Sequence, residues 1–165
     1  MLVAAVLAVI AVPSMAAIIK SIKLSSASNS FVSYLYLARS EAIKRNSRVV
    51  LCKSADGRSC TPSGGWEQGL VVFHDANNNG ALDPGETVIV RAEALPTTLK
   101  LTGNLNVARY VSFASTGATK LVGGGFQAGT LTLCHESGSA GEGRQIIINA
   151  VGRPRVQKVL LNACA

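Results

Sequence analysis

The order of apolar and polar residues divides the chain into one long helix and a β-rich remainder. Residues 1–19 carry no charged side chain, and the first cation is Lys20. Beyond it, apolar and aromatic residues fall on one helical stripe at Phe31, Tyr34, Leu35, Ala38 and Ala42. This spacing is typical of an amphipathic helix. It predicts a helix with an apolar half over residues 1–19 and an amphipathic stem over residues 20–47.

After the stem, the apolar residues follow the pattern of short β-strands. Seven runs are rich in β-branched residues and are bounded by Gly, Asn or Pro, which mark turns. These runs are residues 48–53, 69–74, 87–92, 109–114, 130–135, 144–150 and 155–161. One helix followed by such strands predicts an α+β fold, in which the stem packs on an antiparallel β-sheet domain over residues 48–165.

The uncharged N-terminal segment is open to three interpretations. A cleaved signal peptide fits the small residues around Ala16 and Ala17, but such a peptide begins with basic residues that are absent here. A transmembrane helix needs about 20 apolar residues, and this segment contains Pro13, which removes a backbone donor. The third interpretation is a single rod that continues into the stem.

Charge favours an anionic partner and places it near the C-terminus. The chain has 16 basic and 9 acidic residues, which gives a net charge of +7. This balance suits nucleic acid, anionic lipid or acidic polysaccharide. Residues 144–165 contain four cations and no acidic residue, whereas five of the nine acidic residues lie between Glu67 and Glu93.

The four cysteines predict two disulfides and an oxidising compartment. Cys52 and Cys60 enclose a seven-residue hairpin loop. Cys164 lies one residue from the end of the chain, so a bridge to Cys134 would hold a terminus that otherwise frays. A zinc site is disfavoured because neither pair has the Cys-x-x-Cys spacing of zinc ligands.

The sequence Gly-Arg-Pro-Arg at residues 152–155 is the sharpest candidate site. Gly152 permits a tight turn, and the proline ring stiffens the segment between Arg153 and Arg155. Two guanidinium groups on a rigid turn can each bind phosphate oxygens through forked hydrogen bonds. We expect Lys158 and Arg144 to extend this phosphate-binding patch. The alternative is a solvated basic hairpin or a contact with a neighbouring subunit.

A second motif, over residues 75–86, predicts either a calcium loop or an Asn-rich hairpin. It matches the EF-hand pattern D-x-[DN]-x-[DN]-G-x5-E at every fixed position. The oxygen donors would come from Asp75, Asn77, Asn79, Asp83 and Glu86. Strands are predicted on both sides, where an EF-hand has helices, and Asx turns use the same residue types.

Catalytic chemistry is not indicated. His74 and His135 are read as strand residues, because neither has a serine or cysteine partner in a catalytic order. Trp66 is expected to anchor a loop on the core. The glycines at 123–125 lack the lysine of a phosphate-binding loop. The sequence therefore does not predict an enzyme.

Several segments together resemble the GspH/FimT family of the type IV pilin superfamily. They are residues 65–75, 77–80, 111–113, 116–117, 130–134 and 146–153. The resemblance implies that the N-terminal helix first sits in the bacterial inner membrane as a single pass, with the globular domain in the periplasm. It then packs against other pilin or pseudopilin subunits in a pilus or pseudopilus. No cofactor is implied.

Within that family the Gly-Arg-x-Arg motif marks FimT-like pilins that bind DNA during natural transformation. The resemblance therefore implies a minor pilin of a type IV pilus that binds extracellular double-stranded DNA. The alternatives are an H-type minor pseudopilin of the type II secretion system without a ligand, and a free periplasmic binding domain. The family's basic leader and its Phe-Thr-Leu-Ile-Glu start are not seen, so we expect that residues preceding Met1 are missing.

Overall fold

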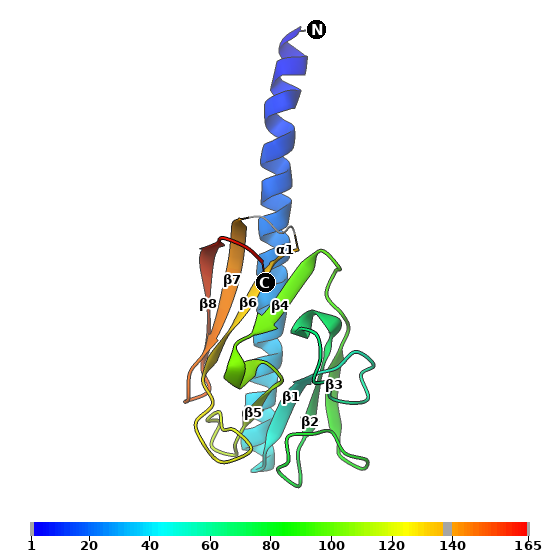
Figure 1. Cartoon of the computed structure of the whole chain (residues 1–165), viewed down its shortest axis with the longest axis vertical. Helices are drawn as coiled ribbons and strands as arrows, with labels where there is room; N and C mark the ends of the chain where they lie inside the picture. The colour runs from blue at the N-terminus through cyan, green and yellow to red at the C-terminus, as the bar shows by residue number, and fades with distance from the viewer. Residues whose placement is uncertain (1, 137–139, 165) are drawn as a thin grey trace.

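A computed structural model of the chain describes residues 2–136 and 140–164, with side chains from Met15 onward. Helix α1 (Leu2–Arg45) runs without a break through the predicted apolar segment and the stem. Its N-terminal part extends beyond the globular domain, and its C-terminal half packs on that domain (Figure 1). Among the described residues, no helix combines the length and hydropathy that a membrane span needs. The prediction that residues 1–19 form an apolar segment lies largely outside the described side chains, which begin at Met15.

The predicted apolar stripe of α1 is confirmed and begins two turns earlier than expected. Its fully buried members are Leu24, Ser28, Phe31, Leu35, Ala38 and Ala42. The helix ends in a Schellman motif. Asn46 has a left-handed φ of 50°, and the amide of Ser47 donates to the carbonyl of Ala42 at 3.2 Å. This end fixes the direction in which the chain enters the first strand.

The strands form two antiparallel four-stranded sheets. The first has the order β3-β2-β1-β5 and comprises β1 (Val49–Lys53), β2 (Leu70–His74), β3 (Val88–Ala92) and β5 (Tyr110–Phe113). The second has the order β4-β6-β7-β8 and comprises β4 (Leu99–Gly103), β6 (Gly129–His135), β7 (Gly141–Ile148) and β8 (Pro154–Leu161). All seven predicted strands are confirmed. Strand β4 and the division into two sheets were not predicted.

One main core joins the stem to the inner faces of both sheets. It includes Leu51 and Val72 from the first sheet and Leu133 from the second. Trp66, in the short 3-10 helix η1 (Trp66–Gln68), packs edge-to-face on Phe31 with 5.3 Å between the ring centroids. Its indole nitrogen donates to the carbonyl of Val107 at 2.9 Å. The predicted anchoring role of Trp66 is therefore confirmed.

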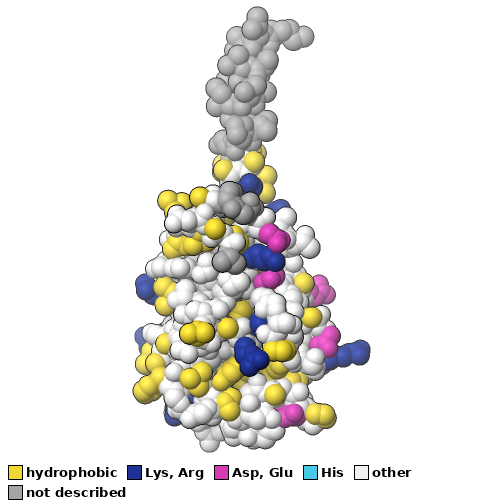
Figure 2. Space-filling view, viewed as in Figure 1, with side chains coloured by type: hydrophobic (Ala, Val, Ile, Leu, Met, Phe, Trp, Pro, Cys, Tyr) yellow, Lys and Arg dark blue, Asp and Glu magenta, His cyan; other side chains and the backbone are white. Residues whose placement is uncertain are grey.

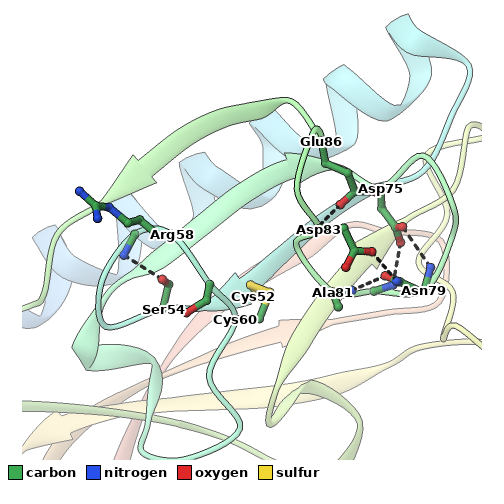
Figure 3. The surroundings of a disulfide bond; sticks show 12 residues. Cys52, Ser54, Arg58, Cys60, Asp75, Asn79, Ala81, Asp83 and Glu86 are labelled. Atoms are coloured by element: carbon green, nitrogen blue, oxygen red, sulfur yellow. Dashed lines mark hydrogen bonds between the residues drawn. A yellow bond between two sulfur atoms is a disulfide. The ribbon is translucent and has the colours of Figure 1, made fainter.

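The outer face of the first sheet is covered by two loops rather than by a second helix. Val50, Cys52, Val71 and Phe73 form a separate buried cluster there. The loop closed by the Cys52–Cys60 disulfide and the loop over residues 75–87 flank this cluster (Figure 3). The second predicted disulfide, Cys134–Cys164, is also present and ties the C-terminal segment to β6.

Candidate functional site

The candidate site is the turn between β7 and β8, and its backbone is closed by its own residues. The amide of Gly152 donates to the Asn149 carbonyl, and the amide of Arg153 donates to the Asn149 side-chain oxygen, both at 2.9 Å. Gly152 has a φ of +75°, and a Cβ atom there would clash with the carbonyl oxygen of Gly117. The glycine is therefore required both by the backbone conformation and by the close approach of the neighbouring loop.

Two segments remote in sequence clamp this turn. Arg39, on α1, donates from Nη1 to the Gly152 carbonyl oxygen at 3.0 Å. Thr119 donates from its hydroxyl to the Asn149 carbonyl at 2.9 Å and from its amide to the Ala150 carbonyl at 3.2 Å. These contacts hold the turn against the stem and the β5–β6 connection. The sequence analysis found neither Arg39 nor Thr119, because nothing local pairs them with a turn more than 25 residues away.

Arg153 and Arg155 project from this clamped turn into solvent. Pro154 is buried and pairs with Ile148, while Arg155 pairs with Ile147 at the start of the β7–β8 ladder. None of the ion pairs found among the described residues includes either arginine. The structure thus places the two predicted arginines on one turn, exposed and without an acidic partner among residues 2–136 and 140–164.

The prediction that Lys158 extends this pair of arginines is wrong. It lies three residues after Arg155 on β8, and successive strand residues point to opposite faces of a sheet. Its partner in the ladder is Arg144, on the face of the sheet that packs toward α1. The Lys158 ammonium lies 3.9 Å from a carboxylate oxygen of Glu142. Lys158 therefore belongs to a different surface from Arg155.

The prediction that Arg144 contributes to the exposed patch is wrong. Its side chain is only 2% exposed, because β7 turns it inward against the stem. Its Nη2 atom donates to the hydroxyls of Ser21 at 3.0 Å and Ser25 at 3.2 Å, and Nη1 lies 3.3 Å from Glu142. A hydrogen bond from Ser21, together with the charge of Arg144, lowers the pKa of Glu142. Arg144 fastens the helix to the second sheet.

The loop over residues 75–86 is held closed by hydrogen bonds of its own (Figure 3). The buried Asp75 carboxylate accepts from the amides of Asn79 at 3.0 Å and Gly80 at 2.9 Å. Burial raises the pKa of Asp75, an effect that the two amides partly oppose. The carboxylate of Glu86 likewise accepts from the amides of Ala76 and Asp83.

The other predicted calcium ligands also form hydrogen bonds within the loop. Asn77 and Asn79 both donate from their side-chain amides to Asp83, at 2.8 and 2.6 Å. Within residues 2–136 and 140–164 there is no group of three or more acidic, histidine or cysteine side chains placed to hold a metal ion. The predicted donor oxygens thus take part in hydrogen bonds within the loop, which is the geometry of the Asx-hairpin interpretation.

Comparison with known proteins agrees with this geometry. The family described as "Type II transport protein GspH" matches residues 27–152. No curated protein matches the chain. A crystal structure of the type IV minor pilin FimU from Pseudomonas aeruginosa (strain PAO1) is similar, with a TM-score of 0.64, 19% identity, and coverage of 88% of this chain and 97% of FimU.

The minor pseudopilin EpsH from the type II secretion system of Vibrio cholerae is also similar, with a TM-score of 0.55 and 17% identity. The alignment covers 82% of this chain and 96% of EpsH. At such identities these structures support the fold alone, whereas the family match spans most of the chain. The chain therefore belongs to the GspH family and is a minor pilin or pseudopilin, of the kind found in type IV pili and type II secretion systems.

Proposed function

We propose that the chain is a FimT-like minor pilin of a type IV pilus, and that Arg153 and Arg155 bind extracellular DNA for natural transformation. The observation that carries this proposal is the pair of arginines exposed on a clamped turn, with no acidic partner among the described residues. Acidic side chains would neutralise the pair before a phosphate could bind. Their absence leaves both guanidinium groups available to an anionic ligand.

Two arginines supply an electrostatic and sequence-independent interaction. Each guanidinium can make forked hydrogen bonds to phosphate oxygens. Each neutralised phosphate releases bound counterions, so affinity falls as salt rises, with a slope of about 0.9 per contact in a double-logarithmic plot. Two contacts give weak binding to one subunit, and several subunits on one fibre would gain affinity through avidity.

The stem supports assembly with other pilin or pseudopilin subunits. Large apolar side chains are exposed on α1 at Met15, Ile18, Ile19 and Ile22. Their spacing places them on one face of the helix, where they stay exposed beside residues such as Ser21 that contact the globular domain. Such a stripe needs a cover, which lipid supplies in the inner membrane before assembly and neighbouring helices supply afterwards. The globular domain then lies in the periplasm until the fibre is built, where its two disulfides are stable.

A second candidate is an H-type minor pseudopilin of a type II secretion system. The description of the matching family favours it, since that family is named for type II transport. In this case the turn at Gly152 would contact a neighbouring subunit rather than DNA. Both candidates share the assembly role, and they differ in whether the isolated subunit binds DNA.

The discriminating experiment compares two variants of the full chain in nonionic detergent. The double variant Arg153→Ala/Arg155→Ala should weaken binding of a labelled DNA duplex at least tenfold at low salt and lower the salt slope by about 2. Lys158→Ala, which removes a cation from the other face of β8, should change the affinity less than twofold. Unchanged binding by the double variant would refute the DNA role and leave the pseudopilin.

A further inference from the structure

Building on the proposed DNA site, we propose that Phe126 is a stacking platform for unpaired nucleobases beside the arginine turn. The site would then bind single-stranded DNA more tightly than a duplex of the same length. The sequence analysis did not single out Phe126. In the structure its ring is 75% exposed on the connection between β5 and β6.

The ring is held outward by the residue that follows it. The side-chain oxygen of Gln127 accepts from the Ser112 amide at 2.9 Å, and its side-chain nitrogen donates to the Tyr110 carbonyl at 2.8 Å. Gln127 is fully buried by these contacts. Neighbouring side chains of an extended segment point in opposite directions, so a buried Gln127 directs Phe126 to solvent. The ring is thus presented on a fixed backbone, which limits the entropy that binding would cost.

One residue links the segment that carries this ring to the arginine turn. The Thr119 hydroxyl shares its one hydrogen between the carbonyl oxygens of Gln127, at 2.6 Å, and Asn149, at 2.9 Å. The Thr119 amide donates to Ala150, and the Thr119 carbonyl accepts from the Gln127 amide. The segment that carries Phe126 and the turn that carries Arg153 are therefore bonded to the same threonine.

The surroundings of the ring are cationic. Lys120 pairs with Phe126 in an isolated antiparallel bridge. The sequence has no acidic residue over 94–135 or over 143–165, the stretches that carry Phe126 and the arginine turn. Figure 2 agrees on the visible face, where the edge over β7 and β8 shows cationic and hydrophobic side chains and no acidic ones. An exposed aromatic ring beside a lysine, on a segment bonded to the arginine turn, has the chemistry that binds single-stranded nucleic acid.

A duplex cannot use this ring in the same way, because its bases are already stacked on one another. An unpaired base presents a free aromatic face, while its phosphates remain available to Arg153 and Arg155. Stacking of one base on an aromatic side chain changes affinity by about tenfold. The arginines therefore bind both forms of DNA, and Phe126 distinguishes between them.

The test measures fluorescence anisotropy of the full chain in nonionic detergent with a labelled single strand of about 16 nucleotides and with the matching duplex. Phe126→Leu keeps an apolar side chain but removes the ring. It should weaken single-strand binding about tenfold and change duplex binding less than twofold. Phe126→Trp should retain the preference for the single strand. Leu160→Ala is the matched control, since Leu160 is 88% exposed on β8, on the face opposite Arg155, and should change neither affinity.

The outcomes separate this inference from the proposed DNA function. Equal effects of Phe126→Leu on both ligands, or no effect on either, would overturn base stacking. Loss of both ligands in Arg153→Ala/Arg155→Ala, with no selective effect at Phe126, would retain the DNA site and overturn only the platform. Unchanged binding of both ligands by the arginine variant would overturn the site itself. Thermal melts of each variant would verify that the fold is intact.

Discussion

Arg39 of the stem helix donates a hydrogen bond to the carbonyl oxygen of Gly152, 113 residues further along the chain, at a distance of 3.0 Å. This bond connects the stem helix, which the proposed assembly would use, directly to the turn that carries Arg153. No flexible loop separates the two. The position of the candidate DNA site relative to the helix axis is therefore set by the fold. A substitution of Gly152, at the centre of this turn, should affect both stability and the site.

Substitution Gly152→Ala should cost more than about 3 kcal/mol of unfolding free energy and should abolish DNA binding. An alanine at positive φ costs about 1–2 kcal/mol, and here its Cβ would also clash with the Gly117 carbonyl. Chemical denaturation measures the loss. The control is Gly85→Ala, where φ is +94° but nothing lies within 4 Å of a new Cβ, so that only the backbone strain is expected. Equal costs for the two variants would contradict the clash.

Substitution Arg144→Ala should destabilise the protein by about 3 kcal/mol, because it removes a buried side chain together with the hydrogen bonds that its guanidinium donates to Ser21 and Ser25. DNA affinity should change less than twofold in the folded variant, since Arg144 faces the stem rather than solvent. Lys158→Ala removes the other cation near Glu142, and this exposed contact should contribute less than about 1 kcal/mol. A loss of DNA affinity in folded Arg144→Ala would contradict the assignment of this arginine to the interior.

Calcium should leave the melting temperature unchanged. The carboxylates of Asp75, Asp83 and Glu86 already accept hydrogen bonds from within the loop. An ion would have to displace those bonds to gain the same oxygens. Thermal melts with millimolar calcium and with excess chelator measure the effect. A rise of several degrees with calcium would show that the loop reorganises around an ion.

The hairpin loop closed by Cys52 and Cys60 should show an acid-dependent contribution from Asp56. Its carboxylate accepts from the amides of Arg58 and Ser59, and these bonds hold the pKa of Asp56 well below its usual 3.8. A lowered pKa in the folded state means that the stabilisation is complete above about pH 4. It is lost as the pH falls through the folded-state pKa.

The variant Asp56→Asn should therefore melt at a lower temperature than the wild type at pH 7, and the difference should narrow below pH 3.8. The measurement is a series of thermal melts across pH 2–7. Glu93→Gln is the control, because no ion pair within the described residues includes Glu93. A difference that stays constant across the range would rule out the carboxylate charge as its cause.

Features with a local cause could be predicted from the sequence. The stripe that includes Phe31 and Leu35 follows from helical spacing, and the disulfides follow from four cysteines in a turn-rich domain. Strand β4 was missed because Leu99 and Leu101 are its only large apolar residues. Its strand conformation depends on pairing with β6, about 30 residues later. The division into two sheets is likewise a matter of long-range pairing, which local patterns do not contain.

The candidate site was predicted only in part, for the same reason. Gly152, Arg153 and Arg155 are adjacent, so their turn could be recognised. Lys158 and Arg155 lie on opposite faces of β8, because side chains alternate along a strand. This difference could have been predicted from the sequence. The burial of Arg144 was not, because it depends on serines of the stem about 120 residues earlier. Phe126 is exposed only because Gln127 finds three partners inside the fold.

The bridge between Cys134 and Cys164 also decides where a label can be attached. It holds the last residues beside β6, at the end of β8 away from Pro154. The eight residues of β8 span about 23 Å at the usual rise per residue. A purification tag or fluorophore fused after the final cysteine therefore leaves the protein beside Lys20, at the end of the stem opposite to Arg39 and the arginine turn. Immobilising the protein through that end on a sensor surface keeps the opposite end open to ligand.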